Sequence, residues 1–170
     1  RKEAFLAISN LNAAFQRLFQ DPKSKQKEFQ LIYEIVTLNQ TMISAIASIG
    51  NFIMNHETTP VSKEFNILIK KISNTLQMSY NSLDHTQIKE KVAEETAERA
   101  QEKLLDKYRQ LSNLRDDSIK QGNTELDTKT LHSLQEAFLI TNHINWLQSL
   151  SENLKKATER YQHSIIDSQG

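Results

Sequence analysis

The sequence predicts an all-α protein, an elongated antiparallel bundle of about five helices. Three Gly and two Pro in 170 residues are too few to punctuate a fold of many strands and turns. Apolar residues recur instead at steps of three and four over long segments, the spacing that places them on one face of a helix. The length fits one domain of ordinary size, so we expect residues 1–170 to form a single helical-bundle domain.

The first helix is predicted over residues 3–20. Its apolar residues follow one face, which we expect to be buried: Ala4, Ile8, Leu11, Phe15 and Leu18. Asp21 and Pro22 then have the order of an N-cap followed by proline at the first helical position, so a second helix should begin there and run to about Asn55.

The second helix carries two apolar lines, which predict a place in the centre of the bundle. The first line consists of Ile32, Ile35, Asn39, Met42, Ile46, Ile49 and Ile53. The second line consists of Leu31, Leu38, Ala45 and Phe52.

The segment Thr58-Thr59-Pro60 predicts the next break, with Thr59 or Ser62 as the N-cap of a third helix that runs to about Leu83. The predicted buried stripe of this helix consists of Phe65, Ile69, Ile72, Leu76 and Leu83.

Residues 85–125 hold 17 charged and 11 apolar side chains, so the fourth helix should be weakly buried. Its apolar seam consists of Ala97, Ala100, Leu104, Leu111 and Leu114. Lys107 occupies one seam position, which predicts packing along a single narrow edge with room for a second subunit beside it. Gln121-Gly122-Asn123 should end this helix.

The last helix is predicted over about residues 128–164, with steps of three and four that suit antiparallel bundle packing. Its stripe consists of Leu131, Leu134, Phe138, Leu147, Leu150, Leu154, Ala157 and Tyr161.

Composition excludes several classes of function. Basic and acidic residues balance at 21 each, without the basic excess through which nucleic-acid binders neutralise phosphates, so no nucleic-acid partner is expected. The chain has no Cys, no glycine-rich phosphate loop and no Gly-x-Ser-x-Gly turn, so we expect no enzyme, no catalytic residues and no cofactor. The most apolar stretch, residues 31–54, is interrupted by polar residues and does not predict a membrane span.

One side of the last helix carries the best cluster of metal-ligand types, His132, Glu136 and His143. The two histidines are about 16 Å apart along a helix, too far to share one ion without distant partners. No metal site is therefore predicted.

His143 and Trp146 form a polar and aromatic group that could line a ligand slot. The alternative is that the indole covers the core and its N–H is satisfied by water or an amide.

The first 27 residues carry a net charge of +4, concentrated in Arg17, Lys23, Lys25 and Lys27. Lysines at the start of a helix oppose the macrodipole unless an anion lies nearby. Three interpretations stay open: a solvated cluster, a contact with acidic side chains such as Glu94, Glu95 and Glu98, and a contact with anionic lipid headgroups.

Ala14 to Leu18 spells Ala-Phe-Gln-Arg-Leu, and Asp21 to Gln26 spells Asp-Pro-Lys-Ser-Lys-Gln. These two segments resemble bacterial FUSC-family inner-membrane proteins, which are related to fusaric acid resistance and aromatic acid efflux. Arg1 to Phe5 and Val36 to Gln40 also resemble that family, although Gln40 stands where the family has a histidine. The resemblance is specific over residues 1–50 and weaker to residue 84.

The resemblance implies a soluble domain at the cytoplasmic face of the bacterial inner membrane, cut from a longer protein. Arg1 and Lys2 directly after a membrane span would obey the positive-inside rule. The domain would serve assembly, coupling or regulation, with self-association and the membrane helices of the same chain as its contacts. The alternatives are a four-helix sensory or ligand-binding bundle and a freestanding protein-interaction module.

Overall fold

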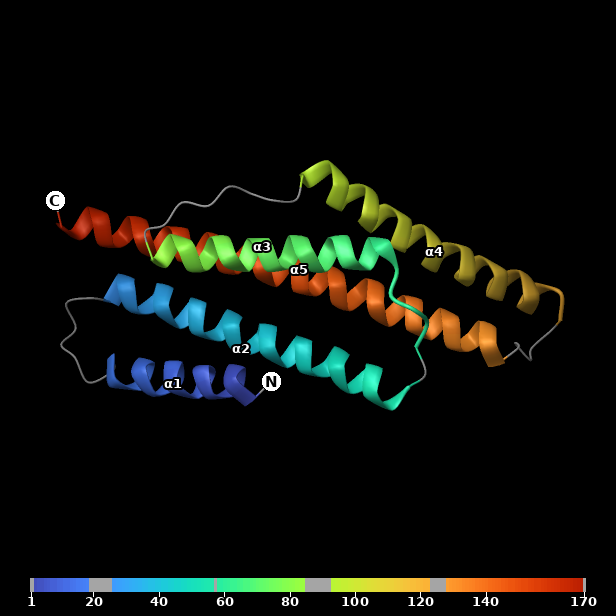
Figure 1. Cartoon of the computed structure of the whole chain (residues 1–170), viewed down its shortest axis with the longest axis horizontal. Helices are drawn as coiled ribbons and strands as arrows, with labels where there is room; N and C mark the ends of the chain where they lie inside the picture. The colour runs from blue at the N-terminus through green and yellow to red at the C-terminus, as the bar shows by residue number, and fades with distance from the viewer. Residues whose placement is uncertain (1, 19–25, 57, 85–92, 123–127, 170) are drawn as a thin grey trace.

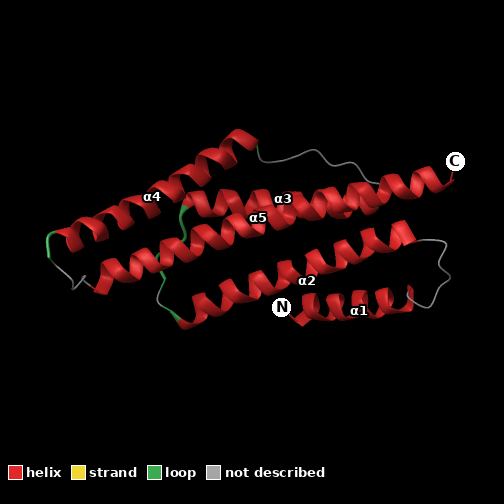
Figure 2. Cartoon of the chain, turned by 180° about the vertical axis from the view of Figure 1, so that it is seen from behind, coloured by secondary structure: helices red, strands yellow, loops and turns green. Residues whose placement is uncertain are grey.

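The computed structural model describes residues 2–18, 26–56, 58–84, 93–122 and 128–169, with the side chains of these residues except 26–28 and 167–169. Within these ranges the chain is a bundle of α-helices, and Figure 2 shows no strand among them. The helices are α1 (Lys2–Leu18), α2 (Gln26–Asn55), α3 (Lys63–Leu83), α4 (Glu94–Lys120) and α5 (Thr128–Gln169). The predicted all-α, elongated bundle is therefore confirmed.

Consecutive helices alternate in direction, so α3 and α5 run the same way along the bundle (Figure 1). The longest helix, α5, has 42 residues and spans about 63 Å at 1.5 Å per residue. It packs against α2, α3 and α4, while α3 also contacts α4 and α1 contacts α2. The helix at the centre is therefore α5, and the prediction that the second helix occupies the centre is wrong.

The helix α2 lies between α1 and α5, which explains its two apolar lines. Ile35, Met42 and Ala45 are buried, whereas Ile46 and Ile53 of the first line are exposed. Ile53 lines a cavity between α2 and the neighbouring helices, which leaves it half exposed.

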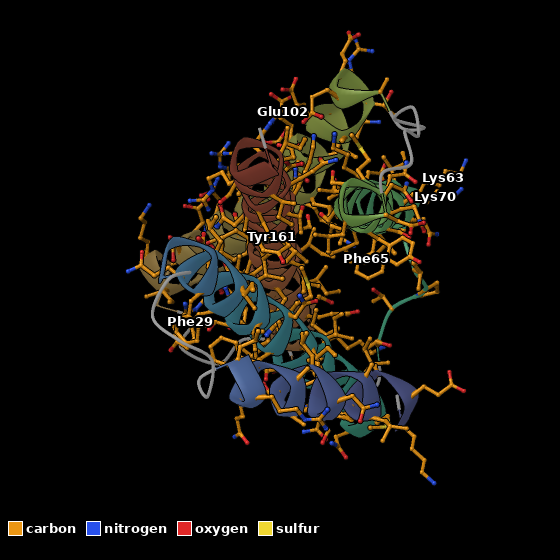
Figure 3. The ribbon with its side chains drawn as sticks, turned by 90° about the vertical axis from the view of Figure 1, so that its left-hand side faces the viewer. Phe29, Lys63, Phe65, Lys70, Glu102 and Tyr161 are labelled. Carbon is orange, nitrogen blue, oxygen red and sulfur yellow. The ribbon has the colours of Figure 1, made fainter. Side chains whose placement is uncertain are left out.

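Only part of the predicted α1 stripe is buried. Phe15 is buried against α2, with its ring centroid 5.0 Å from that of Phe29 and 5.7 Å from that of Tyr33. Figure 3 shows Phe29 on the α1 side of α2. Ala4 and Leu18 are exposed because α1 contacts α2 and no other described helix.

The main core joins α2, α3, α4 and α5. Its buried members are Met42, Ala45, Leu68, Ile72, Ala97, Ala100, Ile144, Leu147 and Leu150. A second cluster of Ile35, Leu154 and Ala157 lies further along α5, and Tyr161 packs against it between α5 and α2 (Figure 3).

The narrow packing edge predicted for the fourth helix is confirmed at Ala97 and Ala100, the buried residues of α4. Their small side chains let α4 approach the core closely. Leu114 is exposed, contrary to prediction, because α4 and α5 extend past the ends of α2 and α3 (Figure 1).

The buried face of α3 is more polar than predicted. Ile69 and Leu83 are exposed, while Lys71, Thr75 and Ser79 are buried. The hydroxyls of Thr75 and Ser79 donate to backbone oxygens four residues earlier in the same helix, at 3.1 and 3.0 Å, so their burial leaves no hydroxyl unpaired. Lys71 forms an ion pair with Glu94 at the start of α4.

The predicted α5 stripe is buried at Leu134, Leu147, Leu150, Leu154 and Ala157. It is exposed at Leu131 and Phe138. Phe138 contacts Tyr108 of α4 instead, with ring centroids 5.7 Å apart.

Two predicted helix ends are confirmed. Ser62 is the N-cap of α3, and its Oγ accepts from the backbone N–H of Phe65 at 3.1 Å. Gln121 caps the end of α4, and Gly122 follows with φ of 82°, a value that glycine adopts without steric cost. The predicted cap at Asp21 and Pro22 lies outside the described residues.

We expect Phe15→Ala to undock α1 and to leave the rest of the bundle folded, because Phe15 is the buried residue of that helix. Replacing a buried Phe by Ala costs about 3 kcal/mol, which exceeds what the remaining contacts of one short helix supply. Amide hydrogen exchange should show lost protection across α1 and unchanged protection in α3 and α5. Phe5→Ala is the control, since Phe5 is 52% exposed. Lost protection throughout the bundle would contradict this prediction.

We expect Glu94→Gln to lower the free energy of unfolding by about 1–3 kcal/mol, because it removes a charged partner of Lys71, which is only 3% exposed. Glu95→Gln is the matched control: Glu95 pairs with Arg99 on the exposed face of the same helix turn, and such pairs contribute about 0–1 kcal/mol. Urea unfolding measures both variants. Equal effects of the two substitutions would contradict a special role for the Lys71 pair.

Candidate ligand cavity

A cavity of about 270 Å³ lies where α2 ends and α3 begins, between these helices and the continuing pair α4 and α5. Its wall is mostly apolar, with contributions from Ile49, Phe52, Phe65, Leu104, Ile140 and Ile144. The cavity is slightly smaller than the range of about 300–1,000 Å³ typical of small-molecule sites. A compact ligand with about one ring would match it.

The cavity wall contains a buried carboxylate, Glu136 of α5, which is 5% exposed. Its Oε1 accepts two hydrogen bonds from Thr59, one from the backbone N–H at 2.8 Å and one from the hydroxyl at 2.9 Å. Among the described residues, none donates a hydrogen bond to Oε2. One oxygen of the carboxylate is therefore fixed by the protein, and the other is left to a further donor.

The connection between α2 and α3 forms one side of the cavity. Thr58 to Ser62 line it, and Ser62 is also the N-cap of α3. The bonds from Thr59 to Glu136 join this connection to α5 across 77 positions of sequence. The same bonds fix the position of the connection and the orientation of the carboxylate.

Lys107 of α4 lines the cavity and is exposed. In the sequence, this lysine occupies a position of the apolar seam of α4 where the spacing calls for an apolar residue. Since the cavity lies beneath this point of α4, the interrupted seam coincides with the edge of the cavity rather than with a contact between helices.

The predicted ligand slot residues lie elsewhere. Trp146 is 46% exposed. Its ring meets that of His143 edge-on, with the ring centroids 6.3 Å apart. His143 Nδ1 donates to Leu139 O at 3.0 Å, and its Nε2 lies 3.5 Å from Ser48 Oγ of α2. Neither residue lines the cavity described above. A ligand slot at this pair stays a prediction.

The predicted basic cluster is described only in part. Arg17 is exposed in the last turn of α1. Lys23 and Lys25 lie outside the described residues, as does the side chain of Lys27. Two of the acidic residues proposed as its partners have partners of their own, Lys71 for Glu94 and Arg99 for Glu95.

The metal-ligand types on α5 do not converge. Glu136 accepts a hydrogen bond from the hydroxyl of Thr59. The ring of His132 meets that of His56 edge-on, with the ring centroids 6.3 Å apart. Across the described parts of the chain, no group of three or more His, Cys, Asp or Glu side chains could hold a metal ion.

Sequence reasoning considered Glu136 only as a metal ligand and missed the cavity. Lys107 was the available indication, because a lysine within an apolar seam marks a point where the seam has no close partner. The partner of Glu136 could not be predicted, since Thr59 lies on a connection and carries no periodic pattern.

No described helix is both long enough and apolar enough to cross a bilayer. Comparisons of the chain with protein-family models, with curated proteins and with solved structures found no match. Membership of the FUSC family therefore stays a prediction.

Proposed function

We propose that this chain is a ligand-binding helical bundle that holds a small, largely apolar molecule in the cavity beside Glu136. The observation that supports this proposal is a buried carboxylate in the wall of a mostly apolar cavity. Ligand sites commonly combine such walls with a few polar groups that fix orientation. The proposed role is recognition, without a chemical step.

The helices around the cavity suit a sensory role. The cavity is lined by the end of α2, the start of α3, α4 and α5, so a bound molecule would contact each helix of the main core. A ligand that binds one arrangement of the helices more tightly than another shifts the population toward that arrangement. Occupancy would then be transmitted as a change in helix packing.

A second candidate function is the one implied by the resemblance, a cytoplasmic domain that assembles or couples a FUSC-like membrane protein at the inner membrane. Exposed apolar side chains favour it, because Phe5 and Leu6 of α1 and Ile46 and Met54 of α2 are all exposed. Large apolar patches on a protein surface often mark interaction sites. The partner would be a second copy or the membrane helices of the same longer chain, with anionic lipid as a further possible contact.

We expect ethylbenzene, a neutral apolar probe, to bind the cavity with saturable chemical-shift changes in the amide spectrum at residues 58–62, 104–111 and 133–144. Ala137→Phe, which fills the cavity, should abolish these shifts. Ser133→Leu fills the same wall more conservatively and should weaken them. Ala13→Phe on exposed α1 is the control that adds the same side chain away from the cavity. Binding that survives both filling variants in folded protein, or no binding to the original chain, would refute the cavity as a ligand site.

For the second candidate, we expect sedimentation velocity to show an average mass that rises with protein concentration. Replacing Phe5 and Leu6 together with Lys should weaken this association, because it places charge on the exposed apolar part of α1. Leu114→Lys tests the alternative contact beside α4, where Leu114 is exposed. A strict monomer at the highest attainable concentration would argue against self-association of this domain.

A further inference from the structure

We infer that the cavity selects molecules with a primary ammonium group on a compact apolar body, and that Glu136 is the residue that recognises the ammonium. This inference rests on the proposed function, since it names the chemical class of ligand that the cavity accepts. It depends on three features of the cavity: the burial of Glu136, the bonding of its two oxygens and the position of Lys107.

Glu136 is a mostly buried carboxylate, an environment that favours a positive partner. An ionised carboxylate taken out of water costs several kcal/mol unless charge or hydrogen bonds compensate for the lost hydration. Thr59 supplies two neutral donors, and the described residues supply no ion pair to Glu136. A ligand cation would complete the compensation.

The bonding of the carboxylate leaves one acceptor oriented for a ligand. A carboxylate offers two oxygens and about four acceptor positions, and Thr59 uses Oε1 for both of its bonds. Two bonds at 2.8 and 2.9 Å from one residue hold the carboxylate in a single orientation. Oε2 is therefore available without loss of the contacts that order the connection between α2 and α3. Thr59 is a positioning residue for this recognition.

The charges around the cavity favour a cation beside Glu136 rather than an anion. Lys107 is the basic residue of the wall, and it is exposed, so solvent screens its charge. Glu136 is buried, where the lower dielectric strengthens its attraction for an opposite charge. His56 follows α2 and His132 lies in α5, and their rings meet edge-on.

The size and walls of the cavity define the rest of the ligand. About 270 Å³ bounded by Phe52, Phe65 and Ile144 accommodates one aromatic ring with a short chain. An ammonium at the end of that chain would reach the carboxylate while the ring fills the apolar part. Primary aryl-alkyl amines have this composition.

The test is isothermal titration of the full chain with three probes of nearly equal shape: 2-phenylethylamine, 2-phenylethanol and 3-phenylpropionate. We expect the amine to bind at least about tenfold more tightly than the alcohol, and the acid to bind most weakly. Glu136→Gln should reduce the affinity for the amine to that for the alcohol. Thr59→Val should reduce the preference for the amine, whereas Thr58→Val, at the adjacent position of the same wall, should retain it.

The outcomes separate the two proposals. If ethylbenzene binds and the amine gains nothing over the alcohol, the inference is wrong and the ligand-binding function stands. An unchanged amine preference in folded Glu136→Gln protein would also overturn the inference. If none of the probes binds the original chain, the proposed function itself is wrong. Because the probe series is measured on the unaltered chain, the test does not depend on whether a variant folds.

Discussion

The bundle depends on one helix, α5, against which α2, α3 and α4 all pack. A helix covered from several directions cannot keep one apolar stripe and one polar face, so part of its polar sequence is buried. Glu136, Thr141, Ser151 and Thr158 are buried in this way. Ser151 and Thr158 donate to backbone oxygens of their own helix at 2.8 Å, which satisfies their hydroxyls internally. Among the described residues, Glu136 has no hydrogen-bond donor within its own helix, and its carboxylate accepts instead from Thr59, in the connection between α2 and α3. The cavity lies where two of the partners of α5 begin or end.

The local parts of the fold could be predicted from the sequence. Helix ends depend on caps, on glycine and on the end of an apolar pattern, and the expected ends near Asn55, Leu83 and Gln121 agree with the structure. The buried side of each helix depends on which neighbours cover it, and this information is not local. Ile69 and Phe138 fit their apolar patterns and are exposed, while Lys71 breaks the pattern and is buried beside Glu94. The central position of α5 was missed for the same reason.

The candidate site was less predictable than the fold. Lys107 could be recognised as an interruption of an apolar seam, and Glu136 as an acidic residue on a helix rich in apolar ones. The cavity itself results from the different lengths of the helices, since α4 and α5 continue past the point where α2 ends and α3 begins (Figure 1). Thr59 and Glu136 meet across 77 positions without any periodic relation. A single sequence contains no physical rule that would pair them.

The buried hydroxyls of α3 and α5 have a mechanical consequence. Thr75, Ser79, Ser151 and Thr158 each donate to a carbonyl of their own helix. Among these four hydroxyls, that of Thr75 also approaches the other helix, with its Oγ1 3.4 Å from Glu152 Oε1. This distance is longer than that of a strong hydrogen bond. Apolar packing, with Leu68 and Ile72 of α3 in one buried cluster with Ile144, Leu147 and Leu150 of α5, therefore contributes more to the axial register of this parallel pair than hydrogen bonds do. A small translation of α3 along α5 would break no hydroxyl bond of either helix, so the interface is suited to shear rather than to hinge bending.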